Sequence, residues 1–260
     1  SLGLVGSEMC IRDSLIAIGG GSSMDTAKAI GIIINNPDFA DVVSLEGVAP
    51  TKNKSVPILA VPTTAGTAAE VTINYVITDA EKNRKMVCVD PKDIPVVAFV
   101  DPDMMSSMPK GLTAATGMDA LTHAIEAYVS TLNSPFTDPL AIKAIEMVLD
   151  YLPQSYKCDM NAREQMHYAQ CLAGQAFSNA LLGIVHSMAH KTGAAFSTGH
   201  IPHGCANAIY LPYVIKYNAH EPEAMHRYAD IARRVGLGGT SEKAQVNALI
   251  AKIEEFNRAM

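Results

Sequence analysis

Four residues on three separated segments have the types and spacing to hold one divalent metal ion. They are Asp119, His123, His186 and His203. The first two are four residues apart, so on a helix they share one face. One carboxylate with three imidazoles suits Zn²⁺, Fe²⁺ or Mn²⁺ and leaves coordination positions free for a substrate oxygen.

Each of these residues also has a purely structural explanation. A lone Asp-x-x-x-His such as 119–123 is more often part of an amphipathic helix with one buried histidine. The Gly-punctuated stretch 183–207 is different, because it holds four histidines: His186, His190, His200 and His203. That density favours a metal site over four independent structural histidines. The other three, His167, His220 and His226, lie among polar helical residues, and we expect them to be solvated.

A glycine-rich loop precedes these segments. Gly19, Gly20, Gly21 and Ser22 stand between a short apolar run and a helical pattern. Glycines at a helix start let backbone N–H groups approach a phosphate, although a glycine run can also be only a tight turn. The loop is neither the spaced G-x-G-x-x-G pattern nor a P-loop. Asp25 is expected in the first turn of the helix, where a carboxylate favours the helix dipole.

A second polar loop, residues 62–72, follows an apolar run. It carries Thr63, Thr64, Thr67 and Thr72. Ligands of α/β sheets gather at the carboxyl ends of strands, which favours a binding role. An ordinary Ser/Thr capping turn is the alternative.

Two hydrophobic periodicities predict the strands and helices that carry these loops and histidines. Short apolar runs at 15–18, 58–61 and 95–100 predict buried strands, 72–78 and 85–89 predict a strand pair, and 24–34 predicts a helix. From residue 112 onward the apolar spacing is helical. The prediction is a partial α/β dinucleotide-binding domain over 15–108, then an all-α metal-binding domain over 109–260, with a cleft between them.

The two ends of the chain do not fit complete domains. Residues 1–14 show neither strand nor helix period, and we interpret them as a translation artefact or a disordered segment. A parallel sheet that binds a dinucleotide needs strands before Leu15, and the last residues run as a helix without a capping signal. We therefore expect a fragment that is truncated at its C-terminal end.

Composition excludes several classes of protein. The net charge is −6, from 20 Lys and Arg against 26 Asp and Glu, which argues against a nucleic-acid partner. No apolar stretch is long enough to span a bilayer. The 5 cysteines are scattered, without a zinc-motif spacing or a disulfide framework. With no signal peptide visible, the cytoplasm is the expected location.

Four motifs occur together in one order. They are Gly19-Gly20-Gly21-Ser22 with Asp25 and Lys28, the segment 62–72, Gly117-Met118-Asp119 through Glu126, and Gly183 through His190 with Pro202-His203-Gly204. In this order they resemble the iron-containing (group III) alcohol dehydrogenases, most of all members acting on lactaldehyde, 1,3-propanediol and butanol. The resemblance runs from Leu15 to the end and implies a dehydroquinate synthase-like architecture.

The resemblance implies a role for each matched position. Asp119, His123, His186 and His203 take the four metal positions, and His190 takes that of a proton-relay histidine. The implied cofactor-binding residues are Gly20, Gly21, Ser22, Thr63, Thr64, Thr67, Thr72 and Lys85. Positions near the substrate and nicotinamide are Asn74, Val76 and Phe177. The implied cofactors are Fe²⁺, with Zn²⁺ as an alternative, and NAD, with NADP as an alternative, in a homodimer.

One departure from the family pattern concerns the fourth ligand. The chain is about three residues longer than many relatives at Ser197-Thr198-Gly199, which makes His200 a rival to His203. We favour His203, because its Pro-His-Gly context matches the family ligand and a loop absorbs an insertion easily.

The resemblance implies reversible oxidation of small primary alcohols or diols by direct hydride transfer to NAD(P). Two alternatives stay open. One is a glycerol dehydrogenase or sugar-phosphate cyclase-like enzyme of the same fold. The other is a non-catalytic fragment, in line with the apparent truncations.

Overall fold

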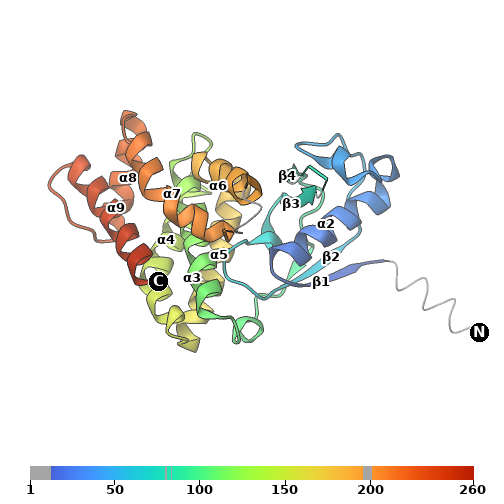
Figure 1. Ribbon diagram of the computed structural model, residues 1–260, viewed down its shortest axis with the longest axis horizontal. Helices are drawn as coiled ribbons and strands as arrows, with labels where there is room; N and C mark the ends of the chain where they lie inside the picture. The colour runs from blue at the N-terminus through green and yellow to red at the C-terminus, as the bar shows by residue number, and fades with distance from the viewer. Residues whose placement is uncertain (1–12, 80, 83, 196–200) are drawn as a thin grey trace, which may run out of the picture.

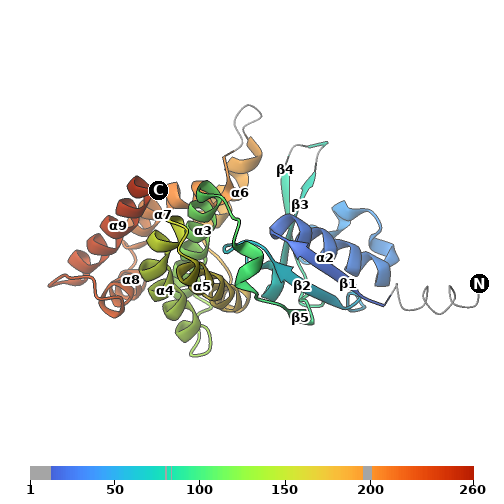
Figure 2. The ribbon, with the colours of Figure 1, turned by 90° about the horizontal axis from the view of Figure 1, so that it is seen from below.

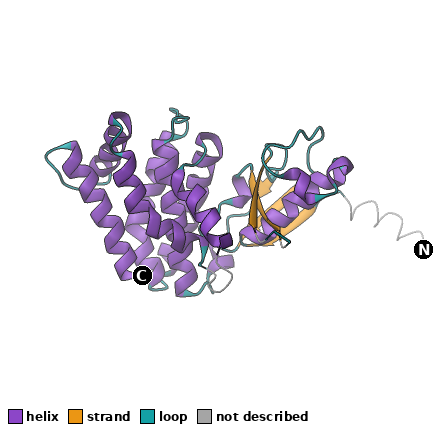
Figure 3. Cartoon of the chain, turned by 45° about the horizontal axis from the view of Figure 1, so that its top comes forward, coloured by secondary structure: helices purple, strands orange, loops and turns teal. Residues whose placement is uncertain are grey.

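The computed structural model describes residues 13–79, 81, 82, 84–195 and 201–260. Two regions lie side by side, a small α/β region at the N-terminal end and a larger helical region (Figure 1 and Figure 2). All strands lie at one end of the molecule (Figure 3). This arrangement confirms the predicted class, an α/β region followed by a helical one.

The α/β region contains two small sheets. Strands β1 (Leu15–Gly19), β2 (Ile58–Pro62) and β5 (Val97–Ala98) form a parallel sheet in the order β1-β2-β5, with Ala17 opposite Ala60. Strands β3 (Asn74–Asp79) and β4 (Arg84–Val89) pair antiparallel. Helix α2 (Gly21–Asn35) follows β1 and contacts both sheets.

The prediction that the parallel strands are buried was wrong for one face. Side chains alternate along a strand, and Ala17, Ile58 and Ala60 pack with Met24 of α2. The alternate residues face outward, and Ile16 and Val97 are 69% and 42% exposed. No element of the described part of the chain covers that face, which continues through Ile18 and Phe99.

Short 3-10 helices occupy the connections. They are η1 (Pro37–Phe39), η2 (Val42–Leu45), η3 (Ala69–Val71) and η4 (Pro102–Met105). The buried side chain of Arg163 donates to the carbonyl oxygens of Met105 and Met108, and so fixes the segment that joins the two regions.

From residue 110 onward every described regular element is a helix. The helices are α3 (Lys110–Val129), α4 (Asp138–Tyr156), α5 (Met160–Ala180), α6 (Ile184–Ala195), α7 (His203–Asn218), α8 (Pro222–Arg234) and α9 (Glu242–Ala259). Their side chains form the largest core of the molecule.

Helix α3 lies inside this bundle and contacts α4, α5, α7 and α8. Every residue from Ala115 to Tyr128 is buried, so this stretch of α3 has no solvent face on which to place a charge. Asp119, His123 and Glu126 nevertheless lie on it, at positions i, i+4 and i+7 of one face. Buried polar groups need partners, so this face of α3 must be satisfied by other elements.

The two regions meet through close backbone and side-chain contacts. A Cβ added to Gly174 of α5 would lie 2.3 Å from the Cβ of Ala68, so only glycine permits this approach. Nearby, Gln170 donates a hydrogen bond to buried Glu70, and the backbone N–H of Ile73 donates to Ser178 Oγ. These contacts fix the segment 66–73 against α5.

None of the described helices is both long and apolar enough to cross a membrane. Residues 1–12, the insertion at Ser197-Thr198-Gly199 and its rival ligand His200 lie outside the described residues. The expectation that His167 is solvated was wrong: its ring is fully buried in α5, whereas His220 and His226 are exposed as expected. The buried face of α5 includes the polar residues Arg163, His167 and Gln170.

Candidate metal centre and cofactor cavity

The four metal-ligand candidates come from three helices that meet in the bundle. Ligand atoms of Asp119 and His123 on α3 and of His186 on α6 all lie within 4.8 Å of one another. His203, the first residue of α7, lies slightly further out, with its Nε2 3.6 Å from Asp119 Oδ1. His186 Nε2 is 3.5 Å from the same oxygen. The fold thus brings together all four predicted residues from three segments.

The imidazoles also pack on one another. The ring of His123 lies between Phe177 and His186, with centroid separations of 4.3 Å on both sides and nearly parallel planes. His190 stacks on His203 at 4.7 Å. Phe177 therefore supports the cluster from α5, in addition to the place near the substrate that the sequence implied for it.

Burial and mutual contact shift the pKa values of these groups in different directions. Burial alone would raise the pKa of Asp119, but the neighbouring rings of His123 and His203 reverse this and lower it. Burial lowers the pKa of His123 to about 3 and also lowers that of His203, so both rings offer lone pairs at pH 7. For His186 burial acts in the same sense, but hydrogen bonds to Asp119 and Glu126 outweigh it and raise the pKa to about 9.

Two further residues complete the cluster, and the search for ligands in the sequence missed both. Glu126 Oε2 lies 2.6 Å from His186 Nδ1, and Glu126 Oε1 accepts from the backbone N–H of Val185. Asn207 of α7 donates to Asp119 Oδ1 at 2.6 Å. The sequence signal for Glu126 was its place on the Asp119 face of α3. For Asn207 the only signal was its i+4 spacing from His203.

These residues fit a divalent cation. The ion-pair partners of the buried Asp119 and Glu126 carboxyl groups, within the described part of the chain, are histidines alone. A divalent cation would balance the charge of the two carboxylates. The Nδ1 atoms of His123 and His203 are buried without a hydrogen-bond partner among the residues described. Three imidazoles gathered around one buried carboxylate are a donor set typical of a divalent metal site.

On the α/β side, the glycine loop presents an open helix N-terminus. Gly20 is the N-cap of α2 and no side chain caps it, so the first backbone N–H groups are free for a phosphate. Gly19 has φ +145°, and a Cβ there would lie 2.4 Å from Ser23 Oγ. Glycine is therefore required at this turn.

The threonine loop lies directly beside the glycine loop. Strands β1 and β2 are parallel neighbours, so their carboxyl ends meet at one edge of the sheet. A Cβ added to Gly20 or Gly21 would lie 3.2 or 3.0 Å from a methyl group of Thr64 or Thr67 respectively. The backbone N–H of Thr63 donates to the carbonyl oxygen of Gly19.

A cavity of about 290 Å³ runs from this edge to the histidine cluster. It is lined by nearly all the predicted site residues: Gly21, Ser22, Thr67, Thr72, Asn74, Val76, Lys85, Asp119, His123, Phe177, His186, His190 and His203. The other predicted cofactor residues, Gly20, Thr63 and Thr64, do not line it, although Thr64 lies against Gly20 and Thr63 is bonded to Gly19.

The cavity wall between the two ends is fixed by a buried lysine. Lys28 of α2 is fully buried, and its ammonium group donates to the carbonyl oxygens of Thr72 and Asn74. Asp25 also lines the cavity, but it is the fifth residue of α2 and the first turn holds no acidic residue. Its expected dipole role was therefore wrong; instead burial raises its pKa to about 6.

Comparison with known proteins agrees with this arrangement. Residues 113–260 match the profile of the Fe-containing alcohol dehydrogenase family, C-terminal, and residues 10–102 match that of iron-containing alcohol dehydrogenase. The chain is 58% identical over 249 residues to lactaldehyde reductase of Escherichia coli (strain K12), covering 95% of this chain and 64% of that protein.

Two other relatives extend the comparison. NADPH-dependent butanol dehydrogenase of Clostridium saccharobutylicum is 56% identical over 250 residues, with 95% of this chain and 63% of that protein covered. The crystal structure of a 1,3-propanediol oxidoreductase superposes with a TM-score of 0.89 at 41% identity, covering 99% of this chain and 66% of that one. The chain thus spans a little under two thirds of the length of these relatives.

Proposed function

Because the chain belongs to the iron-containing alcohol dehydrogenase family, we propose that the protein interconverts a small primary alcohol or diol and its aldehyde. The reaction would use a nicotinamide cofactor and a divalent metal. The observation that carries the proposal is the single cavity of about 290 Å³ that joins the open N-terminus of α2 to the histidine cluster. A nucleotide bound at one end can reach a substrate held at the other.

The proposed metal ligands are Asp119, His123, His186 and His203. Bound there, a divalent metal would supply Lewis-acid polarisation of the substrate oxygen. The family favours Fe²⁺, and Zn²⁺ should bind the same ligands at least as tightly, so metal supply would influence which ion is present.

The chain's own residues would position the reactants. Gly20, Gly21 and Ser22 would bind the pyrophosphate at the start of α2. Thr63, Thr64, Thr67, Thr72 and Lys85 would contact the phosphates and ribose. Asn74, Val76 and Phe177 also line the cavity. The nicotinamide and the substrate carbon would meet beside them for direct hydride transfer.

His190 is the proposed proton carrier. It lines the cavity and stacks on His203. Burial, and then the neighbouring rings of His203 and His186, lower its pKa to about 3. A ring nitrogen of His190 is therefore unprotonated at pH 7, and a proton taken from the alcohol would pass on to solvent rather than stay, as a relay requires.

The substrate and the nucleotide are finer assignments within this proposal. Relatives named for lactaldehyde and butanol support a small primary alcohol or diol as substrate. The butanol dehydrogenase is named for NADPH, so NADP stays beside NAD as a candidate. We also propose a homodimer, as family resemblance implies, which light scattering of the purified protein would test.

The direct test is a comparison of substrates and cofactors on the full-length gene product and on the 260-residue chain. We expect NAD(P)⁺ reduction with butanol, 1,2-propanediol or 1,3-propanediol in preference to glycerol. Glycerol as the best substrate would instead favour a glycerol dehydrogenase. If the 260-residue chain retains metal but binds no NAD⁺ in calorimetry, this polypeptide by itself is a non-catalytic fragment.

A further inference from the structure

Asn207 is placed at the centre of the ligand cluster. It lies on α7 one turn after His203 and its side chain is fully buried. Its Nδ2 atom is 2.6 Å from Asp119 Oδ1, 3.1 Å from His186 Nε2 and 3.3 Å from His203 Nε2. One amide nitrogen thus contacts three of the four proposed metal ligands.

The amide orientation follows from these contacts. An ionised Asp119 can only accept hydrogen bonds, so the group 2.6 Å from its oxygen must be the N–H donor. The two N–H bonds of an amide suffice for Asp119 and for the neutral ring of His203, whose lone pair can accept. The short distance to His186 Nε2 then places the same nitrogen against the third ligand.

Packing alone does not explain an asparagine at this position. Its Oδ1 atom is buried without a hydrogen-bond partner in the described part of the chain. An unpaired buried carbonyl costs on the order of 1–3 kcal/mol, which a leucine of similar shape would avoid. The residue therefore contributes through its N–H groups, and all the acceptors within their reach that the structure describes are proposed metal ligands.

We propose that Asn207 is a positioning residue of the metal site. Its two N–H groups hold the oxygen of Asp119 and the Nε2 atom of His203 toward one point, and the Nε2 atom of His186 lies 3.1 Å from the same nitrogen. With a metal bound, the imidazoles would be its ligands, and the hydrogen bond from Asn207 would orient the carboxylate of Asp119. The inference rests on the proposed metal site.

The test compares two substitutions of Asn207 with a matched change on the same helix. Asn207→Leu keeps the branched shape and removes the donors, whereas Asn207→Ala removes both shape and donors. Asn218→Ala is the control, because Asn218 is also on α7 but donates only to the hydroxyl of Tyr228. Each 260-residue chain is titrated with Zn²⁺ against a chromogenic chelator, and its Co²⁺ form is recorded in visible absorption. Circular dichroism checks that each variant folds.

We expect both Asn207 variants to lose about 10- to 100-fold in Zn²⁺ affinity, the usual cost of removing a group that orients a ligand. Their Co²⁺ bands should shift, and Asn218→Ala should match the unchanged chain in both measurements. If Asn207→Leu binds Zn²⁺ as tightly as the unchanged chain, shape alone is sufficient and the proposal is overturned. Because Leu keeps the volume, it remains informative even if the alanine variant does not fold.

A reference variant separates this result from a failure of the metal site itself. His186→Ala removes a proposed ligand and should abolish stoichiometric binding. If His186→Ala binds Zn²⁺ normally, the metal is not held at this cluster, and the proposed function loses its metal site as well. If His186→Ala fails to bind and Asn207→Leu binds normally, only the role of Asn207 is rejected.

Discussion

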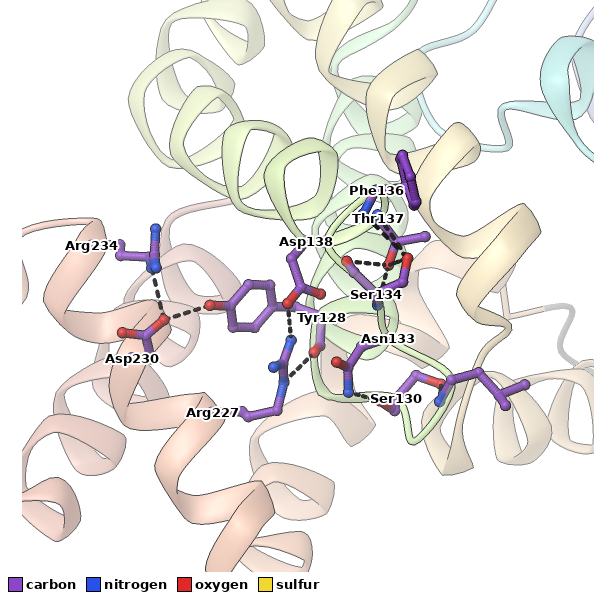
Figure 4. A network of polar contacts seen from close by, with 11 residues as sticks. Tyr128, Ser130, Asn133, Ser134, Phe136, Thr137, Asp138, Arg227, Asp230 and Arg234 are labelled. Carbon is purple, nitrogen blue, oxygen red and sulfur yellow. Dashed lines mark hydrogen bonds and ion pairs between the residues drawn. The ribbon is translucent and has the colours of Figure 1, made fainter.

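Helix α3 takes part in two polar clusters that differ in how their charges are balanced. The metal cluster gathers around Asp119 and His123 in the middle of the helix. The second, the Tyr128 network, lies at its C-terminal end and ties α8 to α3 and α4. Figure 4 shows it, with Asp230 between Tyr128 and Arg234, and Arg227 between Tyr128 and Asp138.

In the Tyr128 network each charged group has an opposite charge beside it. Arg227 pairs with Asp138 at 2.8 Å, donates to the carbonyl oxygen of Tyr128 and stacks over the Tyr128 ring at 4.3 Å. Asp230 accepts from the Tyr128 hydroxyl and from two arginines, Arg233 and Arg234. The charges of this network are balanced within the described part of the chain, so we interpret its role as structural.

In the metal cluster the balance is incomplete. Among the described residues, the ion-pair partners of its two buried carboxyl groups are histidines alone, and burial lowers the pKa values of His123 and His203. Buried nitrogen atoms of both rings have no partner in the described part of the chain. The comparison indicates that a buried polar cluster whose charges are balanced within the protein stabilises the fold. A buried cluster whose charges are not balanced is a candidate ligand site. The following substitutions test that distinction.

The largest effect is expected from His203→Ala. Removing a proposed ligand should reduce bound metal by more than the loss of an outer hydrogen bond, which costs about 10- to 100-fold in affinity. Turnover of the full-length protein should fall with it. Metal content by plasma emission spectroscopy is the measurement; a variant that keeps its metal would instead point to His200 as the ligand.

His190→Ala should separate proton movement from metal binding. We expect metal content to stay unchanged, while turnover falls by roughly 10²- to 10⁴-fold, the range for loss of a general acid–base group. The decisive measurement is the rate across pH in the full-length protein, with metal content as the control. Full activity at every pH would remove the relay role from His190.

Glu126→Gln should weaken the metal cluster by an intermediate amount. The carboxylate accepts from His186 Nδ1–H and thereby presents Nε2 to the cluster. An amide can still accept but carries no charge, so we expect about a 10-fold loss of metal affinity, within the usual range for such partners. Chelator competition measures it; an unchanged affinity would show that His186 needs no such partner.

The contrast between the two clusters could be read only partly from the sequence. The i, i+4 spacing of Asp119 and His123 and the density of histidines after Gly183 pointed to a metal, because ligand types and helical spacing are local. Asn207 could not be identified in this way, because its role arises from α7 packing against α3. For the same reason the burial of His167 was predicted wrongly.

The fold, too, could be predicted only partly from the sequence. Apolar runs located β1, β2 and the β3–β4 pair, since strand propensity is local. They could not tell whether one or both faces of the sheet are covered, because a run such as 95–100 fits either case. Val97, on the uncovered face, is therefore exposed although its neighbours are apolar. Whether a face of the sheet is covered depends on elements that are distant in the sequence. The periodicity within a strand therefore cannot predict it.

Arg227→Met should reduce stability and leave metal binding intact. The substitution removes the pair with Asp138 and the hydrogen bond to Tyr128, both partly buried, so we expect a loss of about 1–2 kcal/mol of unfolding free energy. Urea unfolding measures it, alongside Zn²⁺ affinity. Arg258→Met is the matched control, because its pair with Glu254 is exposed and should contribute little. A fall in Zn²⁺ affinity would contradict the separation of the two clusters.

The smallest effect is a pH dependence carried by Asp230. Partial burial would raise its pKa, but hydrogen bonds from Tyr128, Arg234 and Arg233 reverse this and lower it from 3.8 to about 2. A carboxyl group with a lowered folded-state pKa adds stability that is complete above its unfolded value and is lost as pH falls through the folded value. The advantage of the unchanged chain over Asp230→Asn should therefore be constant from pH 5 to pH 7 and shrink between 3.8 and about 2. Urea midpoints of both chains across this range are the measurement. A difference that stays constant down to the lower limit would mean that the arginines do not hold Asp230 ionised, and the Tyr128 network would then not be closed by its own charges.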